Sequence, residues 1–450
     1  MNKSAEKGLV PELRFPEFQS DGYWCFNELG SKTNKVGSGI TPKGGDKNYK
    51  SAGVPFVRSQ NIGWGDLILE NIAFIEEEVH QSFLGTVIKE NDVLLNITGA
   101  SIGRTAIADQ RVASGNVNQH VCIIRTKLKE LNPVYLCQFI LSPNGQQQID
   151  SFQAGGNREG LNFAQIRSFS IPIPPNVEEQ QKIADCLSSL DELLSAHNQK
   201  LDTLKAHKTG LMQQLFPAEG ETVPRLRFPA FRDQSEWVEF KLIDLVDKNV
   251  KWSFIGGPFG SNLKSSDYVE KGIRIIQLQN IGDAQFNDTY QIFTSKEKAD
   301  ELLANNIYPG DIIISKMGDP VGRACLIPET HHRYVMCSDG IRLVVNEELH
   351  NKYFIYSLIN DIKFRSSIER SATGSTRKRI GLDDLKKLTM LVPKLDEQQK
   401  IANLFFPVDA LIAAQIQKIE SLKTHKKGLM QQLFPSIDGD KMDAKAEVGA

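Results

Sequence analysis

Two distant segments of the chain are copies of each other. Residues 179–217 and 397–435 align without a gap at an offset of 218, and 23 of the 39 aligned residues are identical. Shorter matches precede them: Leu-Arg-Phe-Pro at 13–16 and 226–229, and Gln-Asn-Ile-Gly at 60–63 and 279–282. Solenoid proteins repeat units of about 20–45 residues, far shorter than this one. The chain is therefore a tandem duplication in which each copy has a globular segment followed by a helical segment.

The two matching segments carry the apolar spacing of a coiled coil. Apolar residues recur at alternating intervals of three and four, which is the a/d spacing of a heptad seam. We predict two long helices at 178–217 and 396–435, about 55–60 Å each at 1.5 Å per residue, which pair antiparallel around a pseudo-twofold axis. The alternative is that each helix is only the amphipathic edge of its own domain. The seam residues are Leu187, Leu190, Leu194, Leu201, Leu204, Leu211, Ile412, Ile419, Leu422 and Leu429.

The second helical segment contains an internal proline, Pro407. A proline inside a helix costs roughly 3 kcal/mol because it removes a hydrogen bond and clashes with the preceding turn. We therefore expect a break or a kink at this position, in the second helix only.

The globular segments, 1–177 and 218–395, contain short runs of β-type residues. These runs are punctuated by glycine and asparagine, and helical stretches follow near 133–150 and 350–370. The predicted fold class is therefore α+β (mixed α/β), with two similar domains. The expected strands are 54–57, 93–95, 121–124, 273–276, 311–314 and 341–345. Residues 436–450 are small and polar, and we expect a disordered tail there.

The balance of charge and the cysteines limit the class of protein. Lys and Arg number 53 against 55 Asp and Glu, a formal charge of −2, which excludes a polybasic chain but not a local basic face. No run of about 18 apolar residues exists, and the N-terminus lacks the apolar stretch of a signal peptide. The six cysteines are scattered without a Cys-x-x-Cys pair. We expect reduced core thiols in a cytoplasmic protein.

Motifs for catalysis and metal binding are missing from the sequence. The Asn-Pro-Val-Tyr stretch at 132–135 loosely resembles the Asn-Pro-Pro-Tyr loop of adenine methyltransferases, but no glycine-rich nucleotide loop follows a strand. We interpret it as a helix start with Pro133 at the first position. A phosphate-binding P-loop is absent. His331 and His332 lie near Cys337 but lack a second pair of ligands at zinc spacing. We predict no catalytic residue and no metal site.

Basic and amide side chains in loops are the remaining candidates for function. Lys and Arg neutralise phosphates, and Arg, Asn and Gln form paired hydrogen bonds with base edges. The stretch 374–379 is the most typical of a DNA-binding loop, with a solvated charged surface as the alternative. The candidate DNA-binding residues are Lys43, Lys47, Asn48, Arg58, Asn116, Asn118, Arg158, Asn262, Lys264, Lys316, Arg377, Lys378 and Arg379.

Together, these features resemble the specificity (S) subunits of type I restriction–modification systems. The matching residues are the paired Leu-Arg-Phe-Pro and Gln-Asn-Ile-Gly segments, Ile-Gly-Arg at 102–104 with Val-Gly-Arg at 321–323, and the shared helix ends, Glu-Gln-Gln-Lys-Ile-Ala and Leu-Met-Gln-Gln-Leu-Phe-Pro. The resemblance covers roughly residues 11–435. It implies two target-recognition domains, held apart by an antiparallel coiled coil, that each read one half of a bipartite, asymmetric DNA site.

The resemblance also implies partners and cofactors. The helices would set the gap between the half-sites and dock two methyltransferase subunits, and restriction subunits would join the complex. S-adenosylmethionine, ATP and Mg²⁺ would bind those partners, so that this prokaryotic, cytoplasmic chain binds double-stranded DNA without a cofactor of its own. Two alternatives stay open: a self-contained DNA methyltransferase or nuclease, and a coiled-coil scaffold that binds only protein.

The duplication sorts the candidates by role. If the half-sites differ, residues kept in both copies, such as Arg104 with Arg323 and the Gln-Asn-Ile-Gly segments, serve the fold or contact phosphate. Bases are then read where the copies diverge. These segments are 41–50 and 114–118 in the first copy, and 256–267, 316–320 and 374–379 in the second.

Overall fold

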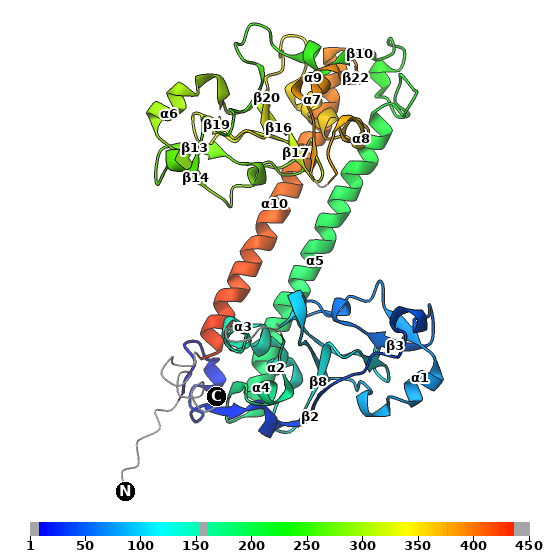
Figure 1. Ribbon diagram of the computed structural model, residues 1–450, viewed down its shortest axis with the longest axis vertical. Coiled ribbons are helices and arrows are strands. Elements are labelled where there is room, and N and C mark those ends of the chain that lie inside the picture. Colours follow the sequence, from blue (N-terminus) through cyan, green and yellow to red (C-terminus); the bar gives the residue numbers. More distant parts are fainter. Residues whose placement is uncertain (1–8, 154–159, 376, 436–450) are drawn as a thin grey trace. The chain divides into compact units, whose positions relative to one another are not determined.

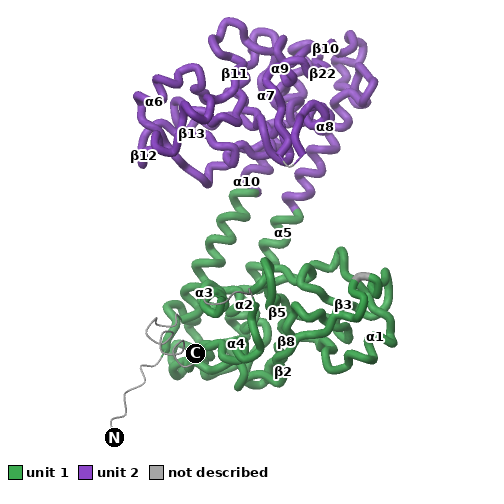
Figure 2. Tube along the Cα trace, viewed as in Figure 1, with its two compact units in different colours: residues 1–199, 416–450 green, residues 200–415 purple. Residues whose placement is uncertain are grey.

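A computed structural model describes residues 9–153, 160–375 and 377–435. The expected tail at 436–450 and the candidate Arg158 lie outside the described residues. The chain forms two compact units, one of residues 1–199 and 416–450 and the other of residues 200–415 (Figure 2). Each unit therefore contains one globular segment together with one end of both long helices. The five-part division drawn from the sequence stays a proposal.

Unit 1 is built on a four-stranded antiparallel sheet in the order β2-β8-β5-β6, of which Figure 1 labels β2 and β8. A three-stranded sheet, β4-β3-β7, and the pair β1–β9 accompany it. The strands are β1 (Cys25–Glu28), β2 (Thr33–Ser38), β3 (Val54–Val57), β4 (Ala73–Ile75), β5 (Val93–Asn96), β6 (Thr105–Ile107), β7 (Asn116–Val117), β8 (Val121–Thr126) and β9 (Ser170–Ile173). The short helices are α1 (Glu77–Gln81), α2 (Pro133–Leu141), α3 (Pro143–Ser151) and α4 (Phe163–Arg167).

Unit 2 repeats this plan with a four-stranded sheet in the order β11-β20-β16-β18. A five-stranded sheet, β12-β14-β13-β19-β15, replaces the three-stranded one, and the pairs β10–β22 and β17–β21 complete the unit. The strands are β10 (Val238–Lys241), β11 (Phe254–Gly256), β12 (Tyr268–Val269), β13 (Ile273–Ile276), β14 (Ile292–Thr294), β15 (Asn306–Ile307), β16 (Ile312–Ser315), β17 (Met317–Gly318), β18 (Ala324–Leu326), β19 (Tyr334–Met336), β20 (Gly340–Leu343), β21 (Lys378–Arg379) and β22 (Thr389–Val392). The short helices are α6 (Lys296–Glu301), α7 (Lys352–Ile359), α8 (Ile362–Ser371) and α9 (Leu382–Lys387).

The central strands are apolar along their whole length because both of their faces are buried. In β5, Val93 and Leu95 pack into the core that contains the helices, whereas Leu94 packs into the core shared with the second sheet. In β16, Ile312 and Ile314 pack on the helix side and Ile313 on the other. A strand covered on both faces has no reason to alternate apolar with polar residues. The predicted strands and the predicted mixed fold class are confirmed.

Both long helices have 39 residues, α5 at Val177–Leu215 and α10 at Leu395–Leu433. In unit 1, the start of α5 and the end of α10 share a core through Ile183, Leu187, Met430 and Leu433. In unit 2, the end of α5 and the start of α10 do so through Met212, Leu215, Ile401 and Phe405. Within each unit, the two helices thus run antiparallel.

The predicted seam residues lie on the inner side of these helices. Leu187, Ile419 and Leu422 are buried, and the other seven are partly buried. In contrast, Leu193, Phe406 and Leu411 of the same helices are exposed. Pairing along the whole seam stays a prediction.

Of the expected break or kink at Pro407, a break is not observed, because α10 continues through this residue, and a kink stays a prediction. The proline is exposed, and so is Asn403, whose carbonyl loses its helical hydrogen bond. Solvent can hydrate that carbonyl, which removes the main reason for a break at this point.

Candidate nucleic-acid interface

In unit 2, strand pairing joins two of the candidate segments. β17 and β21 pair antiparallel, with Met317 opposite Arg379 and Gly318 opposite Lys378. The backbone N–H of Ile380 also donates to the carbonyl of Lys316 at 3.0 Å. Four predicted residues, Lys316, Arg377, Lys378 and Arg379, therefore lie on one ribbon although about 60 residues separate its strands.

The charges on this ribbon are available to a ligand. Arg377 and Arg379 are exposed. Lys378 Nζ lies 2.6 Å from Glu369 Oε1, and this hydrogen bond is the main cause of the lowered pKa of Glu369. Arg379 Nη2 lies 3.5 Å from Asp339 Oδ1. Ion pairs this exposed contribute little stability, so a phosphate group can replace either carboxylate at small cost.

A third candidate segment meets the same place. Gly257 follows β11, and its N–H donates to the carbonyl of Gly340 at 2.8 Å. A Cβ at Gly257 would lie 1.7 Å from the Cys337 carbonyl oxygen, so only glycine fits there. The Lys316 N–H donates to the carbonyl of Asp339 at 2.6 Å. The segments 256–267, 316–320 and 374–379 thus converge on residues 337–340, and both Asn262 and Lys264 are exposed on the first of them.

The loop after Gly257 presents an aromatic residue that sequence reasoning missed. Phe259 is 82 % exposed, and its carbonyl accepts from the Asn262 N–H at 2.8 Å in a tight turn. Exposed aromatic rings stack on nucleic-acid bases in many complexes. A phenylalanine flanked by Pro258 and Gly260, and hence lacking the apolar neighbours of a strand, was the signal available in the sequence.

In unit 1, the candidates divide into exposed and structural residues. Lys43 and Lys47 are exposed. The amide of Asn48 donates to the Lys43 carbonyl at 2.7 Å and to the Gly45 carbonyl at 3.3 Å, so it holds their turn. Arg58 lies over the ring of Tyr49 at 4.9 Å and donates to the Asn71 carbonyl at 3.0 Å.

Two of the amide candidates in unit 1 are buried. Asn116 is fully buried, and its amide nitrogen donates to the Phe83 carbonyl and the Thr86 hydroxyl while its oxygen contacts His80 Nδ1 at 2.6 Å. A base edge cannot reach a side chain so enclosed, and we leave Asn116 out of the interface. Asn118 is buried, and its side-chain oxygen accepts from the His120 N–H at 3.0 Å.

The segment that contains Asn118 occupies the place of residues 337–340. Gly39 donates to the Asn118 carbonyl at 3.2 Å, and a Cβ at Gly39 would lie 1.6 Å from the Val117 carbonyl oxygen. Ile97 donates to the His120 carbonyl at 3.0 Å, and Leu161 donates to the Ile97 carbonyl at 2.9 Å. In unit 2, the corresponding bonds run from the Lys316 N–H to the Asp339 carbonyl and from the Ile380 N–H to the Lys316 carbonyl. Ile97 therefore takes the place of Lys316, and His120 takes that of Asp339.

The Gln-Asn-Ile-Gly segments shared by both copies serve the fold. Asn61 and Asn280 end the short 3-10 helices Ser59–Asn61 and Leu278–Asn280. Each side-chain oxygen accepts the N–H three residues earlier, at 3.0 and 2.8 Å, and each amide nitrogen donates to a carbonyl of the following loop. A Cβ at Gly63 or Gly282 would clash with that loop.

The shared arginines, unlike the asparagines of the Gln-Asn-Ile-Gly segments, are not fully hydrogen-bonded within the described structure. Arg104 and Arg323 are partly buried, and the Nε of each is enclosed without a hydrogen-bond partner among the residues that the structure describes.

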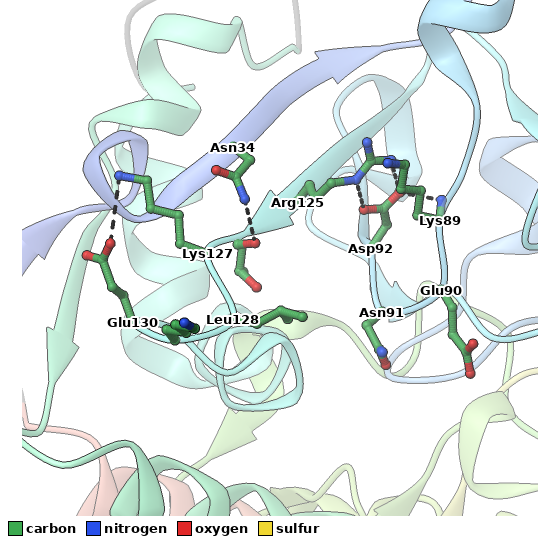
Figure 3. Close-up of a pocket in the computed structure, with 11 residues that line it drawn as sticks. Asn34, Lys89, Glu90, Asn91, Asp92, Arg125, Lys127, Leu128 and Glu130 are labelled. Carbon is green, nitrogen blue, oxygen red and sulfur yellow. Dashed lines mark hydrogen bonds and ion pairs between the residues drawn. The ribbon is translucent and has the colours of Figure 1, made fainter.

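A surface pocket in unit 1 is explained by the fold and not by a ligand. Figure 3 shows its lining, a space of about 500 Å³ between Asn34, residues 89–92 and residues 125–130. Arg125 binds Asp92 through two bonds of 2.7 Å, with Asp92 buried. Arg342 and Asp311 form the corresponding pair in unit 2 at 2.7 Å. An ion pair between neighbouring strands in both copies points to a structural role.

The residues considered and rejected as catalytic or metal-binding candidates lie at the surface or serve the fold. His331 and His332 are exposed, and within 9–153, 160–375 and 377–435 no three His, Cys, Asp or Glu residues are placed to share a metal ion. Asn132 caps α2, with its side chain accepting from Val134 and Tyr135 and with Pro133 in the first turn, as predicted. In the described part of the chain, no helix is long and apolar enough to cross a membrane.

All six cysteines are free thiols. Burial raises the pKa of Cys122, Cys137 and Cys325 to about 12 and that of Cys337 to about 11. The prediction of core thiols is right for these four and wrong for Cys25, which is exposed at the start of β1, and for Cys186, which is only partly buried on α5.

Comparison with protein families decides the identity of the two units. The model of the type I restriction modification DNA specificity domain matches residues 30–206 and again residues 234–424. The chain belongs to this family. Members recognise DNA sequence and carry no catalytic activity, so this specificity subunit has a DNA-reading and not an enzymatic role.

Individual relatives agree with this assignment. The type I restriction enzyme MjaVIII specificity subunit of Methanocaldococcus jannaschii is 21 % identical over 77 % of this chain and 79 % of its own. A candidate specificity subunit of the enzyme MjaX from the same organism is 24 % identical over 96 % and 95 %. The crystal structure of the type I restriction-modification system S subunit from M. genitalium has the same fold, with a TM-score of 0.56, 17 % identity and coverage of 95 % and 100 %.

Proposed function

We propose that each unit of this specificity subunit reads one half of a bipartite, asymmetric DNA sequence. The observation that carries the proposal is the convergence of the divergent segments on residues 337–340 in unit 2, a place that residues 118–121 occupy in unit 1, where Gly39 and Ile97 contact them. At the same place, unit 2 carries Lys316 and Asp339 where unit 1 carries Ile97 and His120. Donors and acceptors that differ at one position of a shared frame suit different base edges.

The basic ribbon of unit 2 would position the DNA backbone. Arg377 is exposed, and Arg379 can exchange its exposed ion pair with Asp339 for a phosphate. Phosphate contacts bind DNA without reading its sequence. Replacement of Arg377 by alanine should weaken binding to all sequences alike and lower the salt dependence of binding by about one counterion. Lys387→Ala, on the short helix α9, is the matched control that leaves the slope unchanged. A change in sequence preference with an unchanged slope would contradict the phosphate role.

A domain exchange tests the assignment of half-sites. Residues 11–177 are replaced by the corresponding segment of another specificity subunit, and the chain is expressed with its methyltransferase partner. Sequencing of the methylated bases should show one new half-site and one unchanged half-site. A change in both would refute independent reading.

We propose that α5 and α10 set the gap between the half-sites. Because each unit contains one end of both helices, the number of residues in the helices should determine the gap. One heptad inserted into α5 between 191 and 208, matched by one in α10 between 409 and 426, adds about 10 Å of helix, or roughly three base pairs. The half-site sequences should stay the same. An unchanged gap would contradict the ruler function.

We further propose that the outer face of the helices docks two methyltransferase subunits. Leu193 and Leu411 are both exposed and occupy equivalent positions, 218 residues apart. Two equivalent apolar positions suit two copies of one partner. Leu193→Glu and Leu411→Glu should each release one methyltransferase subunit in size-exclusion chromatography with mass measurement, and the double change should release both. Leu128→Glu, at an exposed leucine outside the helices, is the control and should release none.

The remaining chemistry belongs to partner subunits in this proposal. S-adenosylmethionine would bind the methyltransferase subunits, and ATP and Mg²⁺ the restriction subunits, with the assembly in the cytoplasm. The purified chain alone should neither methylate nor cleave DNA that carries its site. Activity of the chain alone would support the alternative of a self-contained enzyme. If the chain with its partner failed to bind DNA at every salt concentration, a scaffold that binds only protein would be supported.

A further inference from the structure

Two partly buried ion pairs, in which the aspartate side chains are 36 % and 23 % exposed, join the long helices at equivalent positions. In unit 1, Lys426 Nζ of α10 lies 2.5 Å from Asp191 Oδ1 of α5. In unit 2, Lys208 Nζ of α5 lies 2.6 Å from Asp409 Oδ1 of α10 and 2.9 Å from Oδ2. The offset of 218 relates Asp191 to Asp409 and Lys208 to Lys426. Each unit therefore contains the same pair with the roles of the helices exchanged.

Each pair also binds the neighbouring globular domain. Gln138 of α2 donates to Asp191 Oδ2 at 2.8 Å in unit 1. In unit 2, the Tyr353 hydroxyl of α7 donates to Asp409 Oδ2. Each aspartate thus joins three helices, and the same contact that aligns α5 with α10 also fixes the place of the domain along them.

The positions of the charges permit one alignment of the helices. Residues that face each other on two antiparallel helices have residue numbers with a constant sum. This sum is 617 for both ion pairs, and it is also 617 for the buried residues Leu187 and Met430. A slip by one heptad would place Asp191 opposite Ile419 or Leu433, and Lys208 opposite Ala402 or Ile416. The side chains of Lys208 and Lys426 are only 11 % and 12 % exposed. In any slipped alignment, these charges would stay desolvated without a partner.

Stability alone does not account for these residues. A buried ion pair is on average no more stabilising than well-packed apolar side chains of similar size, whereas one charge left without its partner is strongly destabilising. The apolar seam, by contrast, repeats every seven residues and by itself does not distinguish alignments that differ by one heptad. Polar residues at core positions of coiled coils are known to specify register for this reason.

We propose that Asp191–Lys426 and Lys208–Asp409 form a register lock that selects a single alignment of α5 and α10. The consequence for DNA, a single permitted gap between half-sites, rests on the proposed function of the helices. The lock itself is a property of the helix pair and can be tested without DNA.

Charge reversal tests the pairing. Asp191→Lys places two ammonium groups together and should lower the ratio of folded to unfolded protein in urea titrations by roughly two to three orders of magnitude. Addition of Lys426→Asp should restore most of the loss, because the pair reforms with exchanged charges. Lys423→Glu, at an exposed residue of α10 whose partner Glu420 lies on the same helix, should have little effect. Failure of the second change to rescue the first would overturn the pairing.

The decisive variant replaces all four residues by leucine. It should remain folded, since apolar side chains fill the seam, but it should lose the unique alignment. Spin labels at residues 195 and 421, both exposed in unit 1, report the alignment by double electron–electron resonance after Cys25→Ser and Cys186→Ser. The native residues should give one distance, and the all-leucine variant should add populations at longer distances, because a slip of one heptad moves one label about 10 Å along the helix. One unchanged distance in a folded all-leucine variant would overturn the lock.

DNA binding separates the two proposals. With the methyltransferase partner, the all-leucine variant should bind duplexes of several gap lengths where the native chain binds one. Added distances together with a single preferred gap would keep the lock and refute the ruler. A single distance would refute the lock and leave the ruler standing.

Discussion

The substitution Phe434→Ala should destabilise unit 1 although Phe434 lies at the end of the second repeat. Phe434 is fully buried, with its ring centroid 5.4 Å from that of Tyr135 and 5.5 Å from that of Phe139 in edge-to-face geometry. Removal of such a ring from a core costs about 3–5 kcal/mol, through lost apolar burial and the cavity left behind. A domain is stable by about 5–15 kcal/mol. A loss near 4 kcal/mol is therefore a large part of the stability of unit 1.

Hydrogen exchange with mass spectrometry can assign this loss to a unit. Amides of β8 in unit 1, if they exchange through unfolding of the unit, should exchange about 1000-fold faster in the variant. Amides of β20 in unit 2 should change little. Gln431→Ala, at an exposed position on the same helix end, is the control for a change of sequence without a change of core.

The equivalent phenylalanine gives the mirror experiment. Phe216 is buried in unit 2 against Trp237, Phe354 and Phe405. Phe216→Ala should therefore accelerate exchange in β20 and spare β8, although it belongs to the first repeat. If Phe434→Ala instead accelerated exchange in β20 and Phe216→Ala accelerated exchange in β8, the antiparallel pairing of the helices within the units would be refuted.

Four smaller predictions follow from single contacts. Arg227→Ala leaves the buried carboxylate of its partner Glu397 uncompensated and should cost about 3–5 kcal/mol in urea titrations, with an unchanged midpoint contradicting the burial of the pair. Asn132→Ala removes the cap of α2 and should cost about 1 kcal/mol; Asn132→Ser should recover much of this, and a larger loss for serine would argue against capping. Gly257→Ala should displace the loop with Phe259 and weaken DNA binding, whereas Gly260→Ala, where a Cβ meets open space, should not. Equal effects of the two changes would contradict the close approach of Gly257 to the Cys337 carbonyl. Cys25 should react with a thiol reagent at pH 8 while the four buried cysteines stay unmodified in the folded chain, because burial raises their pKa to about 11–12; fast modification of all would show that these cores open.

The sequence predicted the scaffold well because the scaffold depends on local patterns. The heptad spacing placed both helices within two residues of their observed bounds, and the apolar runs at 54–57 and 273–276 coincide with β3 and β13. A break at Pro407 is absent, since the energetic cost of an interior proline depends on whether solvent can hydrate the freed carbonyl. That depends on which face of the helix is exposed, and the packing of the helix decides it.

The individual roles of the candidate side chains could not be predicted. Asn116 has the neighbours of a loop residue in the sequence, but β7 pairs parallel with β3 across about 60 residues and buries its amide. Likewise, the meeting of Lys316 with Arg379 depends on the pairing of β17 with β21, which no local pattern indicates. Strand pairing over such separations is set by the whole fold, so the position of a polar loop residue relative to solvent remains hidden until the pairing is known.

The exchange of helix ends has a consequence for how the two reading surfaces can diverge. Each core is completed by a helix from the other repeat, through Phe434 in unit 1 and Phe216 in unit 2. A change at the end of one helix therefore acts on the unit built mainly from the other repeat, which restricts change at these positions and at the paired charges. The loops that diverge between the copies lie outside these cores, with exposed side chains at Lys43, Asn262 and Arg377. Loop substitutions can thus alter one half-site without an energetic effect on the other, and a duplicated chain can come to recognise two different sequences on one shared frame.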